Sequence, residues 1–335
     1  MSYIAVIKEG VHTVHKNWQL VIIQFSSMLL SCISFFLIVG IPIAVAFIMF
    51  GLDLTEILRF TDVVSAFKGS AEFLGKYFGM ALVVILSLIV YIAFIVLLWI
   101  FTISGTIGIL SKSMLNEDHR FAVKSFFAAG RRLFFSVFLF SSLVSIIFVT
   151  LAFILGILGG TASAVIEMAK TQEATLALFL GVFFSLVLIS AGVFLITVTL
   201  SITVYGIANV AFNGTKPFNA LKETVKYLYS TPSAVGFYVV LLIGYMIAGF
   251  IVVLIGTPFS LIPIIGPILS LPYQIITYAV QGYVSLVMLS SVFHFYYKTR
   301  HVSTTPQSSL ASDASPKIES EQAPLPVETD TTRQE

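Results

Sequence analysis

Five long stretches of the chain contain no charged side chain and consist mostly of apolar residues: 17–52, 77–111, 133–166, 174–215 and 227–297. About 20 apolar residues in a helix are enough to cross the hydrocarbon core of a bilayer, which is roughly 30 Å thick. The first four stretches can each cross once, and the last, with 71 residues, can cross twice. The pattern therefore predicts an all-α polytopic transmembrane helical bundle with about six spans.

The longest stretch has to turn back, because a continuous helix over 227–297 would be about 107 Å long at 1.5 Å per residue. Prolines remove backbone donors and break helices, and four of them fall between residues 256 and 272. We therefore place the turn there. The expected spans are 19–50, 80–110, 133–158, 176–211, 235–256 and 269–295.

Composition excludes a water-soluble globule. The 335 residues are 58% hydrophobic and 10% charged, whereas soluble domains carry about 25% charged residues. The first apolar run continues far beyond a signal-peptide core, so we expect an uncleaved span. The single cysteine, Cys32, excludes an intramolecular disulfide, and we interpret it as a buried, inert thiol.

The distribution of Lys and Arg predicts the orientation. Twelve of them lie in the N-terminal segment, in loops two and four and in the tail next to the last span. Loops one, three and five together hold four. By the positive-inside rule, both termini lie in the cytoplasm and the protein belongs to the cell membrane. This gives three regions: a cytoplasmic amphipathic helix (1–18), a six-helix transmembrane domain (19–298) and a disordered cytoplasmic tail (299–335), whose composition cannot form a core.

Two outer loops have helical patterns of their own. Loop 51–79 has apolar residues at helical spacing and predicts an interfacial helix. Loop 159–175 opens with Gly159 and Gly160 and then predicts a short separate helix.

Three segments on the predicted cytoplasmic side, 4–18, 121–127 and 218–228, carry apolar residues at helical spacing and run into spans one, three and five. Lys8-Glu9 and Lys222-Glu223 fall at matching places in the first and last, and the middle copy is weaker. We predict amphipathic interfacial helices before these spans. Two explanations stay open: a threefold repeat of amphipathic helix plus hairpin, or the common amphipathic character of juxtamembrane helices.

Two short motifs carry a resemblance: Pro217-Phe218-Asn219-Ala220-Leu221-Lys222-Glu223 before the fifth span, and Phe295-Tyr296-Tyr297-Lys298-Thr299-Arg300 at the end of the sixth. They resemble the membrane domain that accompanies some bacterial glycerophosphoryl diester phosphodiesterases, and its uncharacterised multi-pass relatives. The resemblance implies alternating amphipathic inner helices and hydrophobic hairpins over residues 1–300. In that family the enzyme activity belongs to a separate soluble domain, for which this chain has no counterpart, so the activity is not carried over.

The spans contain no charged residue at mid-depth, and the only histidine in them, His294, lies at the inner end of the last one. Proton relays and ion sites in membranes use such residues, so their absence argues against proton coupling. His12 and His15 are three residues apart. They can be interpreted as part of a metal site or as part of a solvated helix face at the membrane interface. The sequence has no phosphate-binding loop, nucleophile elbow or zinc-protease motif. We expect no enzyme activity, cofactor, metal or nucleic acid.

Weakly polar stripes follow the first and last spans, and their candidate site residues are Gln24, Gln274, Gln281 and Ser285. The simpler interpretation is helix packing through small and hydrogen-bonding side chains. The alternative is a polar path, with Gln274 and Gln281 meeting Gln24 in the bundle centre.

Six basic residues in the amphipathic segments are candidates for contact with anionic lipid headgroups: Lys8, Lys124, Arg131, Arg132, Lys222 and Lys226. The leading hypothesis is therefore a non-enzymatic scaffold or accessory component of the membrane, with lipid headgroups and other membrane proteins as partners. The rival hypothesis is a small transporter or channel for an uncharged or amphiphilic solute.

Overall fold

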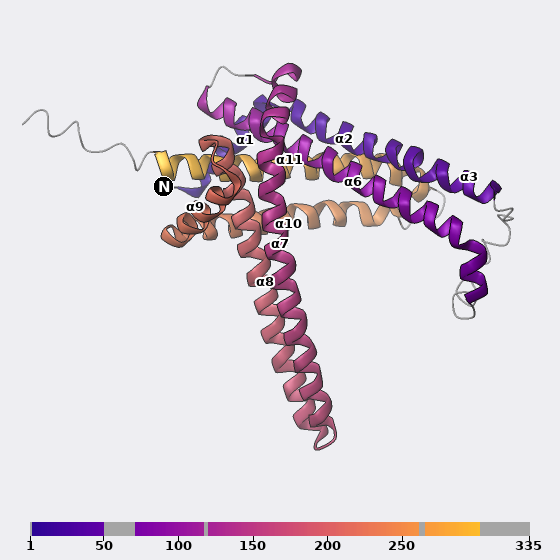
Figure 1. The fold of residues 1–335 in the computed structure, drawn as a ribbon. Helices are drawn as coiled ribbons and strands as arrows, with labels where there is room; N and C mark the ends of the chain where they lie inside the picture. Colours follow the sequence, from indigo (N-terminus) through magenta and orange to yellow (C-terminus); the bar gives the residue numbers. More distant parts are fainter. Residues whose placement is uncertain (1, 50–70, 117–119, 261–264, 302–335) are drawn as a thin grey trace, which may run out of the picture. The chain divides into compact units, whose positions relative to one another are not determined.

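The computed structural model describes residues 2–49, 71–116, 120–260 and 265–301, and Met1–Tyr296 form one compact unit (Figure 1). Every element in the described ranges is a helix. In chain order they are α1 (Tyr3–Lys16), α2 (Gln19–Phe35), a π-helical turn (Phe36–Gly40), α3 (Ile41–Met49), α6 (Ala71–Leu115), α7 (Val123–Lys170), α8 (Ala174–Asn213), α9 (Pro217–Ser230), α10 (Pro232–Ser260) and α11 (Ile265–His301). The all-α prediction is confirmed.

Six helical segments in the described part of the chain are long and apolar enough to cross a membrane: Gln19–Ala46, Ala81–Leu115, Val123–Lys170, Ala174–Asn213, Pro232–Pro258 and Pro272–Arg300. They correspond one to one with the six expected spans. The chain is therefore a multi-pass membrane protein. Two amphipathic helices, α1 and α9, precede the first and fifth spans as predicted.

The first span contains a π-helical turn between α2 and α3. Pro42 follows this turn in α3 and has no backbone N–H, so it cannot donate to the residue four positions before it. A π-helical turn is a common way for a helix to accommodate such a missing bond. Cys32 on α2 is exposed, which corrects the expectation that it is buried. In a bilayer, this exposed thiol lies on a face that lipid can cover.

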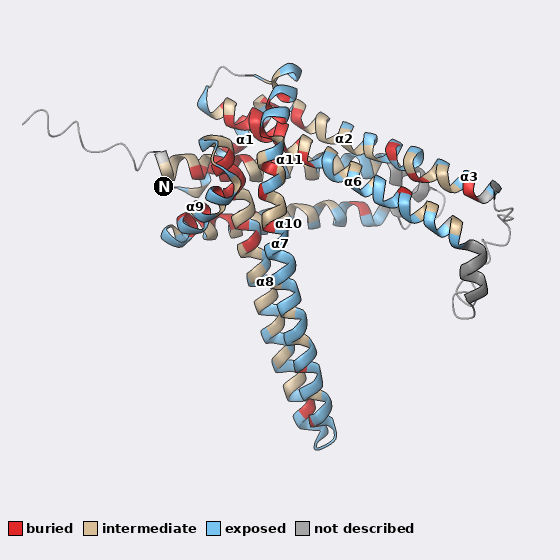
Figure 2. Cartoon of the chain, viewed as in Figure 1, coloured by how far each residue is buried: buried red, intermediate tan, exposed pale blue. Residues whose placement is uncertain are grey.

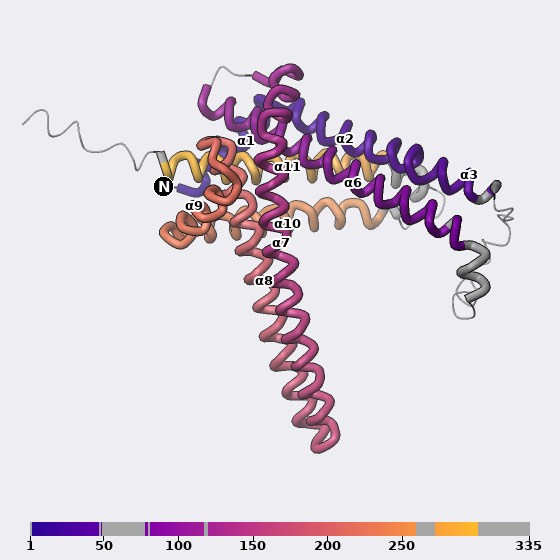
Figure 3. The backbone as a smooth tube through the Cα atoms, viewed as in Figure 1, coloured from indigo at the N-terminus to yellow at the C-terminus, as the bar shows by residue number. Residues whose placement is uncertain are grey.

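Helix α7 is continuous over 48 residues, or about 72 Å at 1.5 Å per residue, and Figure 3 shows its backbone without interruption. The amphipathic segment before the third span is therefore the start of this helix. The prediction of a separate short helix in 159–175 is wrong, because these residues continue α7 as far as Lys170. Two glycines cost a helix only about 1 kcal/mol each, and good helix formers such as Ala162, Ala164 and Met168 follow them.

The ends of α8 and α10 lie close to glycine and proline residues. Helix α8 ends at Asn213 and is capped by Gly214, whose positive φ of 60° suits a glycine C-cap. Helix α10 ends at Ser260 and α11 begins at Ile265, inside the turn predicted between 256 and 272. The interfacial helix expected in 51–79 and the tail expected over 299–335 fall mostly outside the described residues.

The buried core gathers where the amphipathic segments meet the ends of the spans. Figure 2 shows buried residues around α1, α9 and the first turns of α7, whereas most of the α7/α8 hairpin is exposed. The largest fully buried side chains include Tyr205, Phe140, Phe237 and Phe293. In the most hydrophobic window of α8, no residue is buried. Lipid or another membrane protein therefore has to cover this span.

Candidate functional site

Helix α1 lies directly against the end of α11. A side-chain carbon at Gly10 would overlap the backbone and hydroxyl of Ser291, so glycine is required for this close approach. The ring of Tyr3 packs on Phe237 and Phe295, with centroids 5.1 and 6.1 Å away. The side of α1 that carries Val6, Gly10 and Val14 is thus packed on protein, whereas Ile4 and Val11 are exposed.

Polar side chains fix the register of this contact. Thr13 Oγ1 and His294 Nε2 are joined by a hydrogen bond of 2.9 Å, and Glu9 Oε2 lies 3.6 Å from His294 Nδ1. The fully buried Asn17 donates from Nδ2 to the Thr13 carbonyl at 2.9 Å and to Ser113 Oγ at 3.1 Å. These contacts connect α1 to α11 and α6.

The order of hydroxyl, imidazole and carboxylate in Thr13, His294 and Glu9 is the order of a catalytic triad. Two features favour a structural role. The Thr13 side chain is buried, with 7% of its surface exposed, so a substrate carbonyl cannot approach its oxygen. The Glu9–His294 separation of 3.6 Å also exceeds hydrogen-bond distance. We therefore interpret the three residues as a docking contact.

Helix α9 packs on the end of α8 through a second buried amide. Asn209 is fully buried, and its Nδ2 donates to Glu223 Oε2 at 3.2 Å and to the Ala220 carbonyl at 3.4 Å. Asn213 Nδ2 donates to Asn209 Oδ1 at 2.6 Å. The ring of Tyr227 packs between those of Tyr205 and Tyr296. An asparagine pair at the end of an apolar run was the sequence signal for this contact.

The first turns of α7 pack on the end of α6 in the same manner. Side-chain carbons at Gly105 and Gly108 would overlap Phe126 and Ala129, so the two helices approach closely here. Each amphipathic segment therefore contacts the end of a span: α1 on α11, the start of α7 on α6, and α9 on α8. This recurring relation agrees with both explanations of the sequence pattern.

The candidate polar-path residues lie in different surroundings. If Gly282 on α11 carried a side-chain carbon, that carbon would lie 2.8 Å from Gln24 Oε1, so Gln24 contacts α11. Gln281 lines a small cavity of about 10 Å³ with residues of α10, among them Tyr245 and Ala248. Gln274 and Ser285 are exposed. The structure thus brings Gln24 to α11 but directs Gln281 towards α10.

All six basic residues proposed for lipid contact are exposed: Lys8, Lys124, Arg131, Arg132, Lys222 and Lys226. They lie on α1, α9 and the first turns of α7, the segments that pack partly on the ends of the spans. Their charged groups are therefore free to face a leaflet surface.

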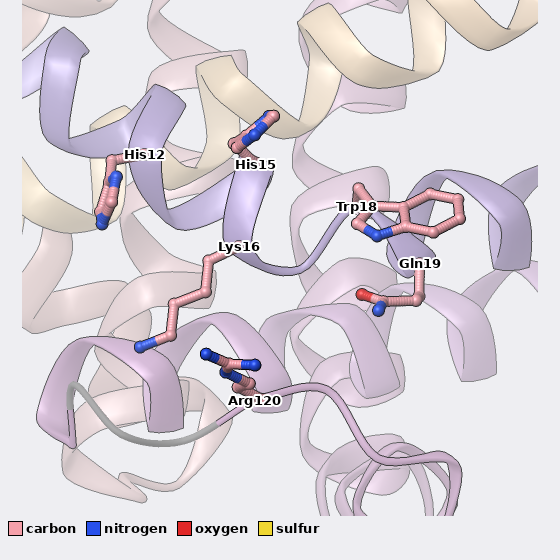
Figure 4. Close-up of a pocket in the computed structure, with 6 residues that line it drawn as sticks. All are labelled: His12, His15, Lys16, Trp18, Gln19 and Arg120. Atoms are coloured by element: carbon pink, nitrogen blue, oxygen red, sulfur yellow. The ribbon is translucent and has the colours of Figure 1, made fainter.

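A basic pocket of about 470 Å³ lies where α1 ends and α2 begins; it is lined by His12, His15, Lys16, Trp18, Gln19 and Arg120 (Figure 4). In this view the side chain of Lys16 extends from α1 towards the side of Arg120 away from Trp18, and Gln19 lies beside Trp18 on the other side of Arg120. The sequence had singled out the two histidines but missed Arg120, which is 105 positions beyond His15. Within the described residues, no three His, Cys, Asp or Glu side chains form a group that could hold a metal ion.

Comparisons with known proteins found no matching family model, no matching curated protein and no matching solved structure. The role of the protein therefore has to be inferred from its own contacts and charges.

Proposed function

We propose that the protein is a non-enzymatic scaffold or accessory component of the cytoplasmic membrane, with its amphipathic segments held against the anionic inner leaflet. The observation that carries this proposal is what the amphipathic segments leave exposed. Part of each segment packs on the end of a span, but its basic side chains are exposed together with apolar ones such as Ile4, Phe127 and Phe218. A segment arranged in this way can attract anionic headgroups and insert apolar side chains at the membrane interface.

The expected electrostatic attraction is strong enough to favour anionic lipids over neutral ones. Each Lys or Arg near an anionic leaflet contributes about 1 kcal/mol, so six residues together favour anionic lipids by several kcal/mol. The exposed apolar faces of α7 and α8 supply the second requirement of a scaffold, a surface open to neighbouring membrane proteins. The implied resemblance to membrane domains that accompany a soluble enzyme fits such an accessory role and is part of this proposal.

The first prediction concerns the lipids retained by the protein. Replacement of all six basic residues by Gln is expected to lower the number of phosphatidylglycerol molecules that co-purify from mixed phosphatidylglycerol and phosphatidylcholine nanodiscs, because the electrostatic attraction is lost. Native mass spectrometry counts the bound lipids. The matched control exchanges Lys for Arg and Arg for Lys at the same six positions, and should retain lipid like the wild type. Equal retention by the Gln variant would contradict the lipid contact.

A second prediction tests orientation. In a Cys32→Ser background, Lys226→Cys is expected to react with a membrane-impermeant maleimide only after cells are opened, since the Lys and Arg distribution places residue 226 in the cytoplasm. Asp62→Cys in the first outer loop should react in intact cells. Labelling of both positions from one side would refute the topology on which the lipid proposal depends.

Partners distinguish a scaffold from an isolated lipid-binding protein. Crosslinking in native membranes followed by purification should recover a stable membrane-protein partner, with full-length chain and with a chain lacking 299–335. Failure to recover one in both cases would weigh against a scaffold. Labelling of Thr13 by a fluorophosphonate probe would contradict the non-enzymatic role.

The transporter hypothesis has one contact in its favour, that of Gln24 with Gly282 on α11. If the stripe lines a route, solute efflux from reconstituted liposomes should fall when Gln274 and Gln281 are replaced by Leu. Flux that is present and unchanged in this double variant would remove the proposed path. Absence of flux for every uncharged solute tested would favour the scaffold.

A further inference from the structure

The basic pocket at the junction of α1 and α2 is a different feature from the six exposed basic residues. None of those six lines it, and its walls come from two chain segments, 12–19 and Arg120. With a volume of about 470 Å³, it is within the range of roughly 300–1,000 Å³ that holds small organic ligands. It is therefore large enough for a headgroup rather than a bare ion.

Among the described residues, no carboxylate neutralises the charges in the pocket. Within the described part of the chain, no carboxylate forms an ion pair with Lys16 or Arg120, whereas Lys170 pairs with Glu167 at 3.6 Å. The C-terminal end of α1 and the N-terminal end of α2 meet here, so their helix dipoles oppose each other. The positive potential thus comes from the side chains, and it favours an anion.

The donor set matches phosphate chemistry. A guanidinium offers paired N–H donors to phosphate oxygens, and an ammonium adds a point charge. The Gln19 amide provides a further donor at the end of the pocket beside Trp18, and the imidazoles of His12 and His15 lie on α1 (Figure 4). None of the described residues that line the pocket is a carboxylate, which would repel phosphate.

The position of the pocket sets its depth in the membrane. Gln19 is the first residue of the first span, and the neighbouring Trp18 is 53% exposed. Tryptophan rings concentrate at the level of lipid headgroups. A pocket beside Trp18 and Gln19 is therefore level with the phosphates of the adjacent leaflet.

We propose that this pocket binds the phosphate group of a phosphate-bearing ligand, with Lys16 and Arg120 as its cationic partners and Gln19 as a neutral donor. The same chemistry fits the phosphodiester of an anionic lipid or a water-soluble phosphate ester. The proposal goes beyond the scaffold role, because it assigns a defined binding site to residues outside the six that provide general attraction.

The test uses the full chain in nanodiscs, with Trp99→Phe introduced so that Trp18 is the single tryptophan. One arm raises the phosphatidylglycerol fraction in phosphatidylcholine; the other adds inorganic phosphate or glycerol 3-phosphate to phosphatidylcholine nanodiscs. We expect a saturable change in Trp18 emission. In Lys16→Gln/Arg120→Gln the midpoint should shift at least about tenfold, the change expected for loss of a charge-assisted hydrogen bond.

The matched control is Lys112→Gln/Lys216→Gln, which removes the same charge from two residues that neither line the pocket nor belong to the six. It should shift the midpoint less than about twofold, since charges away from the pocket are screened. Saturation by lipid alone would identify a headgroup site, and saturation by the soluble phosphates would identify a soluble ligand. No saturable change in either arm would overturn the proposal. Equal shifts in both double variants would also overturn it and would indicate general attraction, which leaves the proposed function intact.

Discussion

Gly206→Ala is expected to destabilise the protein by about 1–3 kcal/mol, the usual cost of overpacking a core, whereas Gly192→Ala in the same helix is expected to stabilise it by up to about 1 kcal/mol. A side-chain carbon at Gly206 would overlap the ring of Phe140 on α7. That ring is fully buried and has no free space to enter. At Gly192 no heavy atom lies within 4 Å, so only the gain in helix propensity acts. Unfolding by dodecyl sulfate in mixed micelles measures both changes.

A compensating substitution separates the steric effect from a general defect of α8. Phe140→Leu shortens the side chain that would be overlapped, so Gly206→Ala/Phe140→Leu should lose less stability than the sum of the two single changes. Additive losses, or equal shifts for Gly206→Ala and Gly192→Ala, would show that α7 and α8 do not meet at Phe140.

The six spans could be predicted because charge is so costly in hydrocarbon that its absence marks them. Helix ends beyond the membrane are not constrained in this way. Residues 123–132 are both amphipathic and helical, so the sequence pattern is the same whether they form a separate helix or the start of α7. Likewise, a glycine pair such as Gly159-Gly160 ends a helix only when the residues after it disfavour helix. The residues that follow this pair in α7 favour it.

Tertiary partners of the amphipathic helices could not be deduced from periodicity. The spacing of Val6 and Val14 shows that one face of α1 is apolar, and lipid or protein could cover that face equally well. The close approach of Gly10 to Ser291 shows that protein covers this face. A single glycine in the sequence of a helix does not predict such a contact, because the partner helix is not known at that point. The basic pocket was missed for the same reason, since Arg120 is distant from Lys16 in sequence.

Asn209→Ala is expected to destabilise the protein by about 2–4 kcal/mol, because each neutral hydrogen bond contributes about 1 kcal/mol and one to a charged group about 1.5–3 kcal/mol. The amide of Asn209 donates to Glu223 Oε2 and to the Ala220 carbonyl and accepts from Asn213. It is fully buried, so water cannot replace these partners. Unfolding in mixed micelles measures the loss, and protease cleavage within α9 should become faster as the helix detaches from α8.

Glu223→Gln makes the measurement specific to the pair. It keeps a side-chain oxygen that can accept from Asn209 but removes the charge, so its own cost should be smaller. In a double-mutant cycle the two changes should show an interaction energy of about 0.5–3 kcal/mol, the range found for residues in direct contact. Strict additivity would mean that Asn209 acts through packing alone. An interaction of the expected size would establish that the buried amide holds α9, and with it Lys222 and Lys226, against α8.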